Sequence, residues 1–158
     1  MTRFSADTKA EAVVTASRAE IWAALTDPAL IAELTPFVRR ITAEGDHWRW
    51  ELSGLKVLGV GVEPAFTELM TYDEPERIDF RHDPPDGETE RSGVEGWYEL
   101  TEVDEGTRLV TSLEITLDLP LPKASSRAVK AAMGKVVDQM GERFSKGLLA
   151  HLDAEEVA

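Results

Sequence analysis

The amino-acid sequence predicts an α+β fold in which antiparallel strands are followed by one long C-terminal helix. Three observations lead to this prediction. Residues 1–37 carry the signals of one strand and two short helices. Turn residues then divide residues 38–119 into runs of about seven to twelve residues, as in an antiparallel meander. After Pro122 the apolar spacing changes to the three- and four-residue steps of a helix.

The composition is that of one soluble acidic domain spanning residues 1–158. The chain has 17 Lys plus Arg against 30 Asp plus Glu, a formal net charge of −13, and 42% hydrophobic residues. A chain of this length can bury a real core. Its negative charge repels phosphate backbones, so we expect no nucleic-acid partner. The absence of cysteine excludes disulfides, a thiol nucleophile and a zinc–thiolate site. Because there is no signal-peptide pattern and no apolar run of membrane length, we expect a cytoplasmic location.

The N-terminal elements are predicted from local signals. Residues 10–16 (AEAVVTA) are apolar and β-branched, which favours a strand. Ser17 and Glu20 fit a capping box that starts a helix. Asp27-Pro28 ends this helix and begins a second short one, which ends at Thr35-Pro36.

Alternating polarity assigns two faces to the strands between residues 38 and 119. Trp48 and Trp50 share one side of their strand, while charged neighbours share the other. The last strand alternates in the same way through Leu113. We therefore expect a sheet with one dry face and one wet face.

Residues 125–152 predict a helix about 40 Å long, which is enough to cross the dry face of a whole sheet. Ser125 or Ser126 is expected to cap its start, and residues 153–156 are expected to fray into an acidic tail. A glycine inside a helix costs about 1 kcal/mol relative to alanine. Close packing against the sheet, room for a ligand or a kink must therefore account for Gly134, Gly141 and Gly147.

The order of elements resembles the helix-grip fold of the START-like (SRPBCC) superfamily, which includes polyketide cyclases, lipid-transfer domains and plant pollen allergens. Residues 16–28 (ASRAEIWAALTDP) are similar to the family's opening, in which a Val/Ile-Trp pair and an Asp-Pro stop follow the first strand. Residues 96–100 (GWYEL) and 106–111 (GTRLVT) resemble its paired late strands. The resemblance covers residues 9–152. It implies a curved antiparallel sheet of about seven strands around the long helix, often with a hydrophobic cavity between them, and no shared catalytic motif.

If the chain follows this resemblance, the dry strand faces and the inward face of the long helix line a ligand cavity. An ordinary packed core is the alternative for each of these residues. The candidates from the apolar pattern are Trp48, Trp50, Phe66, Met70, Ile78, Phe80, Tyr98, Leu113, Met133, Val137, Met140 and Phe144.

Glu68 is the polar residue that alternation sends toward the dry face, because it is in phase with Phe66 and Met70. A buried carboxylate must be paired, hydrogen-bonded or protonated. It could orient a ligand hydroxyl or transfer a proton. A bulge from residues 59–61 would instead shift the register, expose Glu68 and bury Leu69, and this alternative is slightly favoured.

Other polar candidates are weaker. His82 is in phase with Phe80 and would lie at a strand end near a cavity mouth, although a lone histidine is more often structural. Tyr98 and Thr111 could donate hydrogen bonds to a ligand carbonyl, or bond each other or water. The three histidines lack metal-binding spacing, and residues 59–61 lack the rest of a phosphate-binding motif. We therefore expect no metal, no cofactor and no assigned catalytic residue.

Three hypotheses for the function remain. The first, ranked highest, is non-enzymatic binding or carriage of a small hydrophobic ligand such as a lipid, quinone or aromatic polyketide. The second is an enzyme similar to polyketide cyclases or aromatases, in which Glu68, His82 or Tyr98 transfers protons. The third is a protein-interaction or maturation module.

The third hypothesis needs an exposed apolar patch. The segment that could supply it, or could instead form a cavity lid, contains Leu55, Val57, Leu58 and Val60. Trp97 and Val110, on the nominally wet face, are candidates for a homodimer interface.

Overall fold

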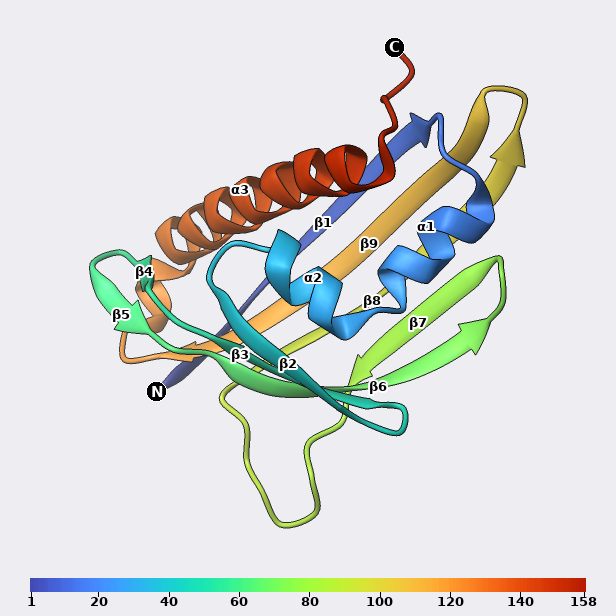
Figure 1. The fold of residues 1–158 in the computed structure, drawn as a ribbon. Coiled ribbons are helices and arrows are strands. Elements are labelled where there is room, and N and C mark those ends of the chain that lie inside the picture. The colour runs from blue at the N-terminus through green and yellow to red at the C-terminus, as the bar shows by residue number, and fades with distance from the viewer.

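A seven-stranded antiparallel sheet curves around one long helix in the computed structural model, which describes residues 1–158 (Figure 1). The helices are α1 (Arg18–Leu25), α2 (Pro28–Leu34) and α3 (Ser126–Leu152), preceded by a 3-10 turn, η1 (Lys123–Ser125). The strands are β1 (Thr2–Val14), β2 (Val38–Glu44), β3 (His47–Leu52), β4 (Leu55–Val57), β5 (Val60–Val62), β6 (Ala65–Asp73), β7 (Arg77–His82), β8 (Ser92–Val103) and β9 (Gly106–Leu119).

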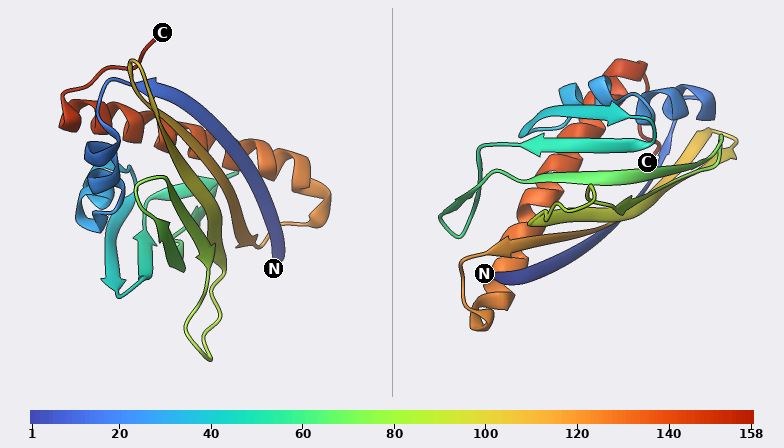
Figure 2. Two further views of the ribbon diagram at one scale, coloured as in Figure 1. Left: turned by 90° about the vertical axis from the view of Figure 1, so that its right-hand side faces the viewer. Right: turned by 90° about the horizontal axis from the view of Figure 1, so that it is seen from below.

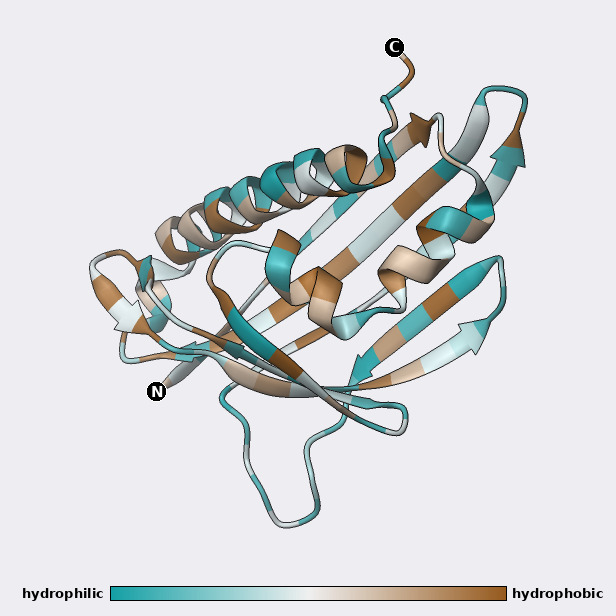
Figure 3. Ribbon diagram, viewed as in Figure 1, coloured by the Kyte–Doolittle hydropathy of each residue, from teal (hydrophilic) through white to brown (hydrophobic).

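The sheet has the order β1-β9-β8-β7-β6-β3-β2, and β4 and β5 form a separate two-stranded hairpin. Figure 2 shows the strands curving beneath α3, with α1 and α2 beside it. Apolar and polar residues alternate along β7 and β9 (Figure 3). The buried apolar residues of these strands lie on the face toward the helices, so this face is the dry one. The predicted α+β fold and element order are confirmed.

β1 begins much earlier than the predicted strand at residues 10–16. It pairs with β9 without interruption from Thr2↔Leu119 to Val14↔Thr107. Residues 2–9 are largely polar and carry little strand signal of their own, but the long partner β9 supplies the hydrogen bonds that an edge strand needs.

The short helices begin as predicted. The Ser17 hydroxyl accepts from the Glu20 backbone N–H at 3.2 Å, and the Ser17 N–H donates to the Glu20 carboxylate at 3.3 Å. Asp27 caps α2 by accepting from the Leu30 N–H at 3.2 Å.

Ser125 is the N-cap residue of α3, as predicted, but its side chain makes no capping hydrogen bond. The hydroxyls of Ser125 and Ser126 donate to the carbonyls of Pro122 and Lys123, at 2.6 and 2.7 Å. They are engaged in this way because η1 precedes the α-helix.

The C-terminal tail is held in place, which corrects the expectation that residues 153–156 fray. Asp153 takes a left-handed conformation (φ 50°) that turns the chain back toward the end of β1. The Thr15 N–H donates to the Glu155 carbonyl at 2.9 Å, and the Val157 N–H donates to the Val13 carbonyl at 2.7 Å. These partners are far apart in the sequence, so a local pattern does not show the pairing.

Buried apolar residues form three clusters between the sheet and the helices. One cluster lies where α1 and α2 cover the strands and includes Ile21, Leu25 and Ile78, each fully buried. A second packs Leu119 and Val129 beneath the N-terminal end of α3. The third is formed by Leu52, Leu55 and Phe66. Ile78 is thus a core residue and not the cavity residue that alternation predicted. None of the three α-helices has the length and apolar character required to span a membrane.

Candidate ligand cavity

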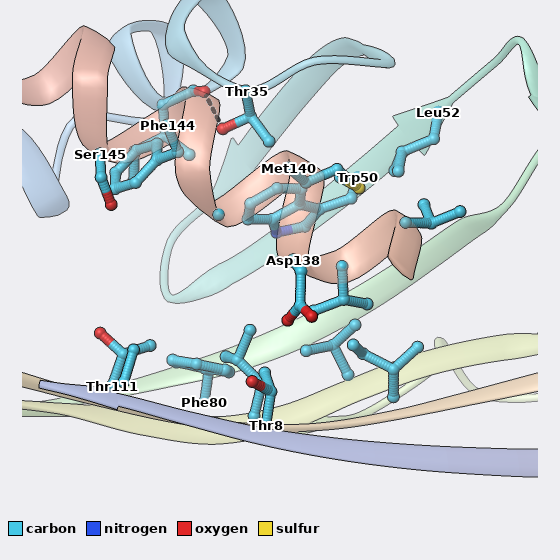
Figure 4. A pocket seen from close by; sticks show the side chains of 18 of the residues that line it. Thr8, Thr35, Trp50, Leu52, Phe80, Thr111, Asp138, Met140, Phe144 and Ser145 are labelled. Atoms are coloured by element: carbon cyan, nitrogen blue, oxygen red, sulfur yellow. Dashed lines mark hydrogen bonds between the residues drawn. The ribbon is translucent and has the colours of Figure 1, made fainter. Parts of the chain in front are cut away.

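A cavity of about 520 Å³ lies between α3 and the concave face of the sheet. Of its 40 lining residues, 27 are hydrophobic, so the space suits a largely apolar ligand. Figure 4 shows side chains facing each other across this space, with Trp50, Met140 and Phe144 on one side and Phe80 and Thr111 on the other. The side chains of the protein do not fill it.

Most of the predicted site residues lie around this cavity. His82 and, as described above, Ile78 are the exceptions. The predicted residues that line the cavity are Trp48, Trp50, Phe66, Glu68, Met70, Phe80, Tyr98, Thr111, Leu113, Met133, Val137, Met140 and Phe144. That they contact a ligand stays a prediction.

His82 does not line the cavity, which corrects its predicted place at the cavity mouth. Its Nε2 lies 2.8 Å from Oε1 of Glu90, and a Cβ atom on Gly93 would come within 2.6 Å of its ring. The alternation fails here because the pairing of β7 with β8 ends at Phe80↔Gly96, two residues earlier. Beyond that point, the loop that returns to β8 brings Glu90 to the histidine.

Glu68 does point into the protein, so the bulge alternative is wrong. Glu68 is 3% exposed. β6 pairs regularly with β3 at Trp48↔Glu68 and with β7 at Glu68↔His82. Residues 59–61 belong to the separate β4–β5 hairpin, so they do not shift the register of β6.

The carboxyl group of Glu68 has no hydrogen-bond partner within the protein, and it lines the cavity. Burial raises its pKa to about 8, because the charged form loses its hydration. The indole N–H of Trp50 faces it and partly opposes this shift, although Trp50 Nε1 itself is buried without reaching hydrogen-bond geometry. Near neutral pH the group is therefore mainly a neutral carboxylic acid.

Tyr98 completes a small polar cluster with Glu68 and Trp50, one residue from each of β8, β6 and β3. Burial and the nearby Glu68 charge raise the pKa of the Tyr98 phenol well above its usual value, so its hydroxyl keeps its proton. Thr111 is the cross-strand partner of Tyr98, yet no hydrogen bond joins the two side chains. The cluster thus offers donors to the cavity that no protein group accepts.

The cavity opens where α3 passes the edge strand β1. Apart from Glu156 of the tail, its exposed lining residues lie on these two elements, and they include Ala10, Asp138 and Glu142. Every charged residue of the lining is acidic, namely Glu68, Asp138, Glu142 and Glu156. No lysine, arginine or histidine lines the cavity. No group of three or more metal-ligating side chains is placed to hold an ion.

The family model described as polyketide cyclase / dehydrase and lipid transport matches residues 5–152. The chain belongs to this family. The match covers almost the whole sequence and confirms the resemblance to the START-like superfamily. No curated protein matches the chain in sequence.

Solved structures share the fold. The di-domain ARO/CYC StfQ from the steffimycin biosynthetic pathway is 15% identical, with a TM-score of 0.70, and the match covers 95% of this chain and 51% of StfQ. This chain therefore spans about half the length of StfQ. The Zhui aromatase/cyclase from Streptomyces sp. R1128 is 14% identical (TM-score 0.66, covering 96% of this chain and 95% of Zhui).

A START superfamily protein from Mycobacterium smegmatis is 18% identical, with a TM-score of 0.62, and the match covers 94% of this chain and 97% of that protein. At these identities the likeness concerns the fold alone.

In this family member the β4–β5 hairpin closes one end of the cavity. Leu55 and Val57 are buried and line the space, and Leu58 at the tip is the one large apolar residue of the hairpin that is substantially exposed, at 49%. The hairpin turns through Leu58 and Gly59, both with positive φ, as in a type I′ turn. The exposed apolar patch that the interaction hypothesis requires is therefore absent from this segment.

The three glycines of α3 have different surroundings. A Cβ atom on Gly147 would lie 3.0 Å from a methyl group of Leu34, so this glycine allows α2 to approach closely. A Cβ atom on Gly141 or Gly134 would meet nothing within 4 Å. Gly141 borders the main cavity, and Gly134 borders a smaller groove beside β1.

Trp97 on the convex face is covered within the chain. The guanidinium carbon of Arg77 lies 4.6 Å from the centre of its ring, and the ammonium of Lys9 lies 5.7 Å away. Both cations partly shield the ring from solvent. A homodimer through Trp97 and Val110 stays a prediction.

Proposed function

We propose that the protein binds and carries a small hydrophobic ligand in the cavity between the sheet and α3. The observation that carries this proposal is the unfilled apolar space of about 520 Å³, which is bordered by residues of all three core clusters. An empty apolar cavity costs stability because its lining loses packing contacts. A lipid, a quinone or an aromatic polyketide would restore them.

The absence of a converging acid–base pair supports carriage. Glu68 lies in the cavity, but His82 binds Glu90 outside it. General acid–base chemistry needs its groups within hydrogen-bond reach of the reacting atoms.

A proton-transfer enzyme is the second candidate, favoured by one observation. Glu68 has a pKa of about 8, so it can donate and accept a proton near neutral pH, and it faces the same space as Tyr98. The family includes cyclases and dehydrases, whose reactions require proton transfer.

Native mass spectrometry on gently purified protein, followed by organic extraction, tests the proposal. A bound hydrophobic compound should appear as added mass, and it should stabilise stripped protein by about 2.7 kcal/mol at a hundred times its dissociation constant. A compound that leaves unchanged after incubation supports carriage, and a converted compound supports the enzyme. A protein that gains no stability from any hydrophobic extract would contradict both.

Two matched variants of α3 locate the binding. Val137→Trp places a large side chain in the cavity wall, whereas Lys135→Trp places the same side chain on the exposed side of the helix. Circular dichroism establishes that both fold. Only Val137→Trp is expected to lose the stabilisation by ligand, and equal losses would place the ligand elsewhere.

A further inference from the structure

The charged groups around the cavity all have the same sign. Asp138 and Glu142 are exposed at the mouth, Glu156 lines the cavity from the tail, and Glu68 lies inside. Lys146 pairs with Glu142 at 3.2 Å, but both side chains are largely solvated, so this pair contributes little. An anion entering the cavity therefore meets acidic groups and no cation in its lining.

The interior lacks the partners that a buried anion needs. An ionised carboxylate or phosphate loses its hydration in an apolar cavity and requires a counter-charge there. The arginine nearest in sequence to Trp50, Arg49, pairs instead with Glu90 outside the cavity, at 3.4 Å. Fatty-acid anions and phospholipid headgroups thus have no counter-ion in this space.

The polar cluster calls for a different ligand group. Trp50 Nε1–H can only donate a hydrogen bond, and it has no acceptor in the protein. Glu68, 3% exposed and unpartnered, and the protonated Tyr98 hydroxyl can also donate. A carbonyl oxygen, as in a ketone or quinone, has two lone pairs and no proton, so it can accept from two of these donors, Trp50 and Glu68.

We propose that the cavity selects an uncharged aromatic ligand whose carbonyl oxygen accepts hydrogen bonds from Trp50 and Glu68, and that it excludes carboxylates. This inference rests on the proposed function and names the chemical class of its ligand. The aromatic walls fit the class, because Trp50 stacks on Phe66 with ring centres 5.8 Å apart, and Phe80 lies 5.4 Å from Tyr98.

Three probes with one ring system separate the contributions. 2-Methylanthracene is apolar, 2-acetylanthracene adds a carbonyl, and anthracene-2-carboxylate adds a charge. Titration of the whole protein at pH 7, followed by tryptophan fluorescence and calorimetry, gives the three dissociation constants. The ketone should bind about tenfold more tightly than the methyl compound, because it pairs otherwise unsatisfied buried donors. The carboxylate should bind at least about tenfold more weakly than the ketone.

Two variants test whether Trp50 and Glu68 cause the preference for the ketone over the methyl compound. Trp50→Phe removes the indole N–H, and Glu68→Leu removes the carboxyl group and its burial cost. Each should bring ketone affinity to within about threefold of the affinity for the methyl compound. Trp48→Phe, a matched indole-to-phenyl change in the cavity wall, should alter both affinities equally and keep their ratio.

The outcomes separate the inference from the proposed function. If the methyl compound and the ketone bind wild-type protein equally, or the carboxylate binds most tightly, the inference is overturned and hydrophobic binding stands. If Trp50→Phe and Glu68→Leu both keep the ketone preference, the assigned donors are wrong. If none of the three probes binds, the proposed function fails together with the inference.

Discussion

Two buried glutamates, Glu90 and Glu68, both lie beside Thr67 and His82, but only the carboxylate of Glu90 has hydrogen-bond partners. Glu90 is 8% exposed and accepts from the backbone N–H and hydroxyl of Thr67, each at 2.8 Å, while His82 and Arg49 approach it as well. Glu68, next to Thr67 in sequence, is 3% exposed and has no hydrogen-bond partner. The satisfied carboxylate joins β6, β7 and the loop before β8, whereas the unsatisfied carboxyl faces the cavity.

The difference teaches how a structural polar group can be distinguished from a ligand-binding one. Folding leaves few buried polar groups without partners, since each one costs free energy. Glu90 meets this requirement within the chain. Glu68 and Trp50 do not, and both border an unfilled space. The cost is offset when a ligand supplies the missing partners.

The largest expected effect is the pH dependence of stability that Glu68 creates. Its pKa is about 8 in the folded protein and 4.5 as a model value for the unfolded chain. Between these values the folded state holds a proton that the unfolded state has released, so stability falls as pH rises from about 4.5 to about 8. The loss is on the order of 4 kcal/mol. Glu68→Gln should remove it, as measured by urea unfolding at pH 5 and pH 8.5.

Glu88→Gln controls for the change in net charge, because Glu88 is an exposed residue. This variant should keep the wild-type loss of stability between the two pH values. An equal loss in Glu68→Gln would mean that Glu68 is not held protonated by burial.

The second prediction concerns the hydrogen bonds that Glu90 accepts. Glu90→Ala leaves the Thr67 N–H and hydroxyl and the His82 ring without their shared acceptor. We expect a loss of about 2–3 kcal/mol in the free energy of unfolding at pH 7. Glu90→Gln keeps one acceptor oxygen and should lose less.

Neither Glu90 variant should change the dissociation constant of 2-methylanthracene once the fraction of folded protein is taken into account. A cavity affinity that falls while stability stays unchanged would assign Glu90 to ligand binding and end the distinction between the two glutamates.

The sequence predicts the members of the cavity better than their chemistry. Alternation placed Trp48, Phe66 and Met70 on the dry face, because β3 and β6 pair regularly and a period of two is a local property. The helical period likewise placed Met140 and Phe144 toward the sheet. These patterns need no knowledge of distant segments.

The remaining features depend on contacts between distant segments. Whether Glu68 faced inward depended on where residues 59–61 lie, and they belong to a separate hairpin. The orientation of His82 depended on a loop that returns Glu90 to it, and the ordered tail depended on pairing with β1. Whether a buried polar group has a partner is therefore the part of the site that periodicity does not predict.

The smallest expected effect is a change in stability at two glycines of α3, one beside open space and one packed against α2. Alanine at Gly141 gains helix propensity and meets nothing within 4 Å, so Gly141→Ala should stabilise the protein by about 1 kcal/mol. At Gly147 the same methyl group would come within 3.0 Å of Leu34, which offsets the gain, so Gly147→Ala should be close to neutral. Thermal unfolding measures both. Equal stabilisation would mean that α2 yields easily at Leu34.

Larger side chains at the open glycines then connect stability to binding. Gly141→Leu adds a side chain at the border of the cavity, whereas Gly134→Leu adds one at the border of the neighbouring groove beside β1. Both gain helix propensity, so their stabilities should rise together. Only Gly141→Leu should weaken the binding of 2-methylanthracene, because it occupies ligand space. Equal affinities in the two variants would place the ligand away from this stretch of α3, at the end of the cavity beneath the β4–β5 hairpin.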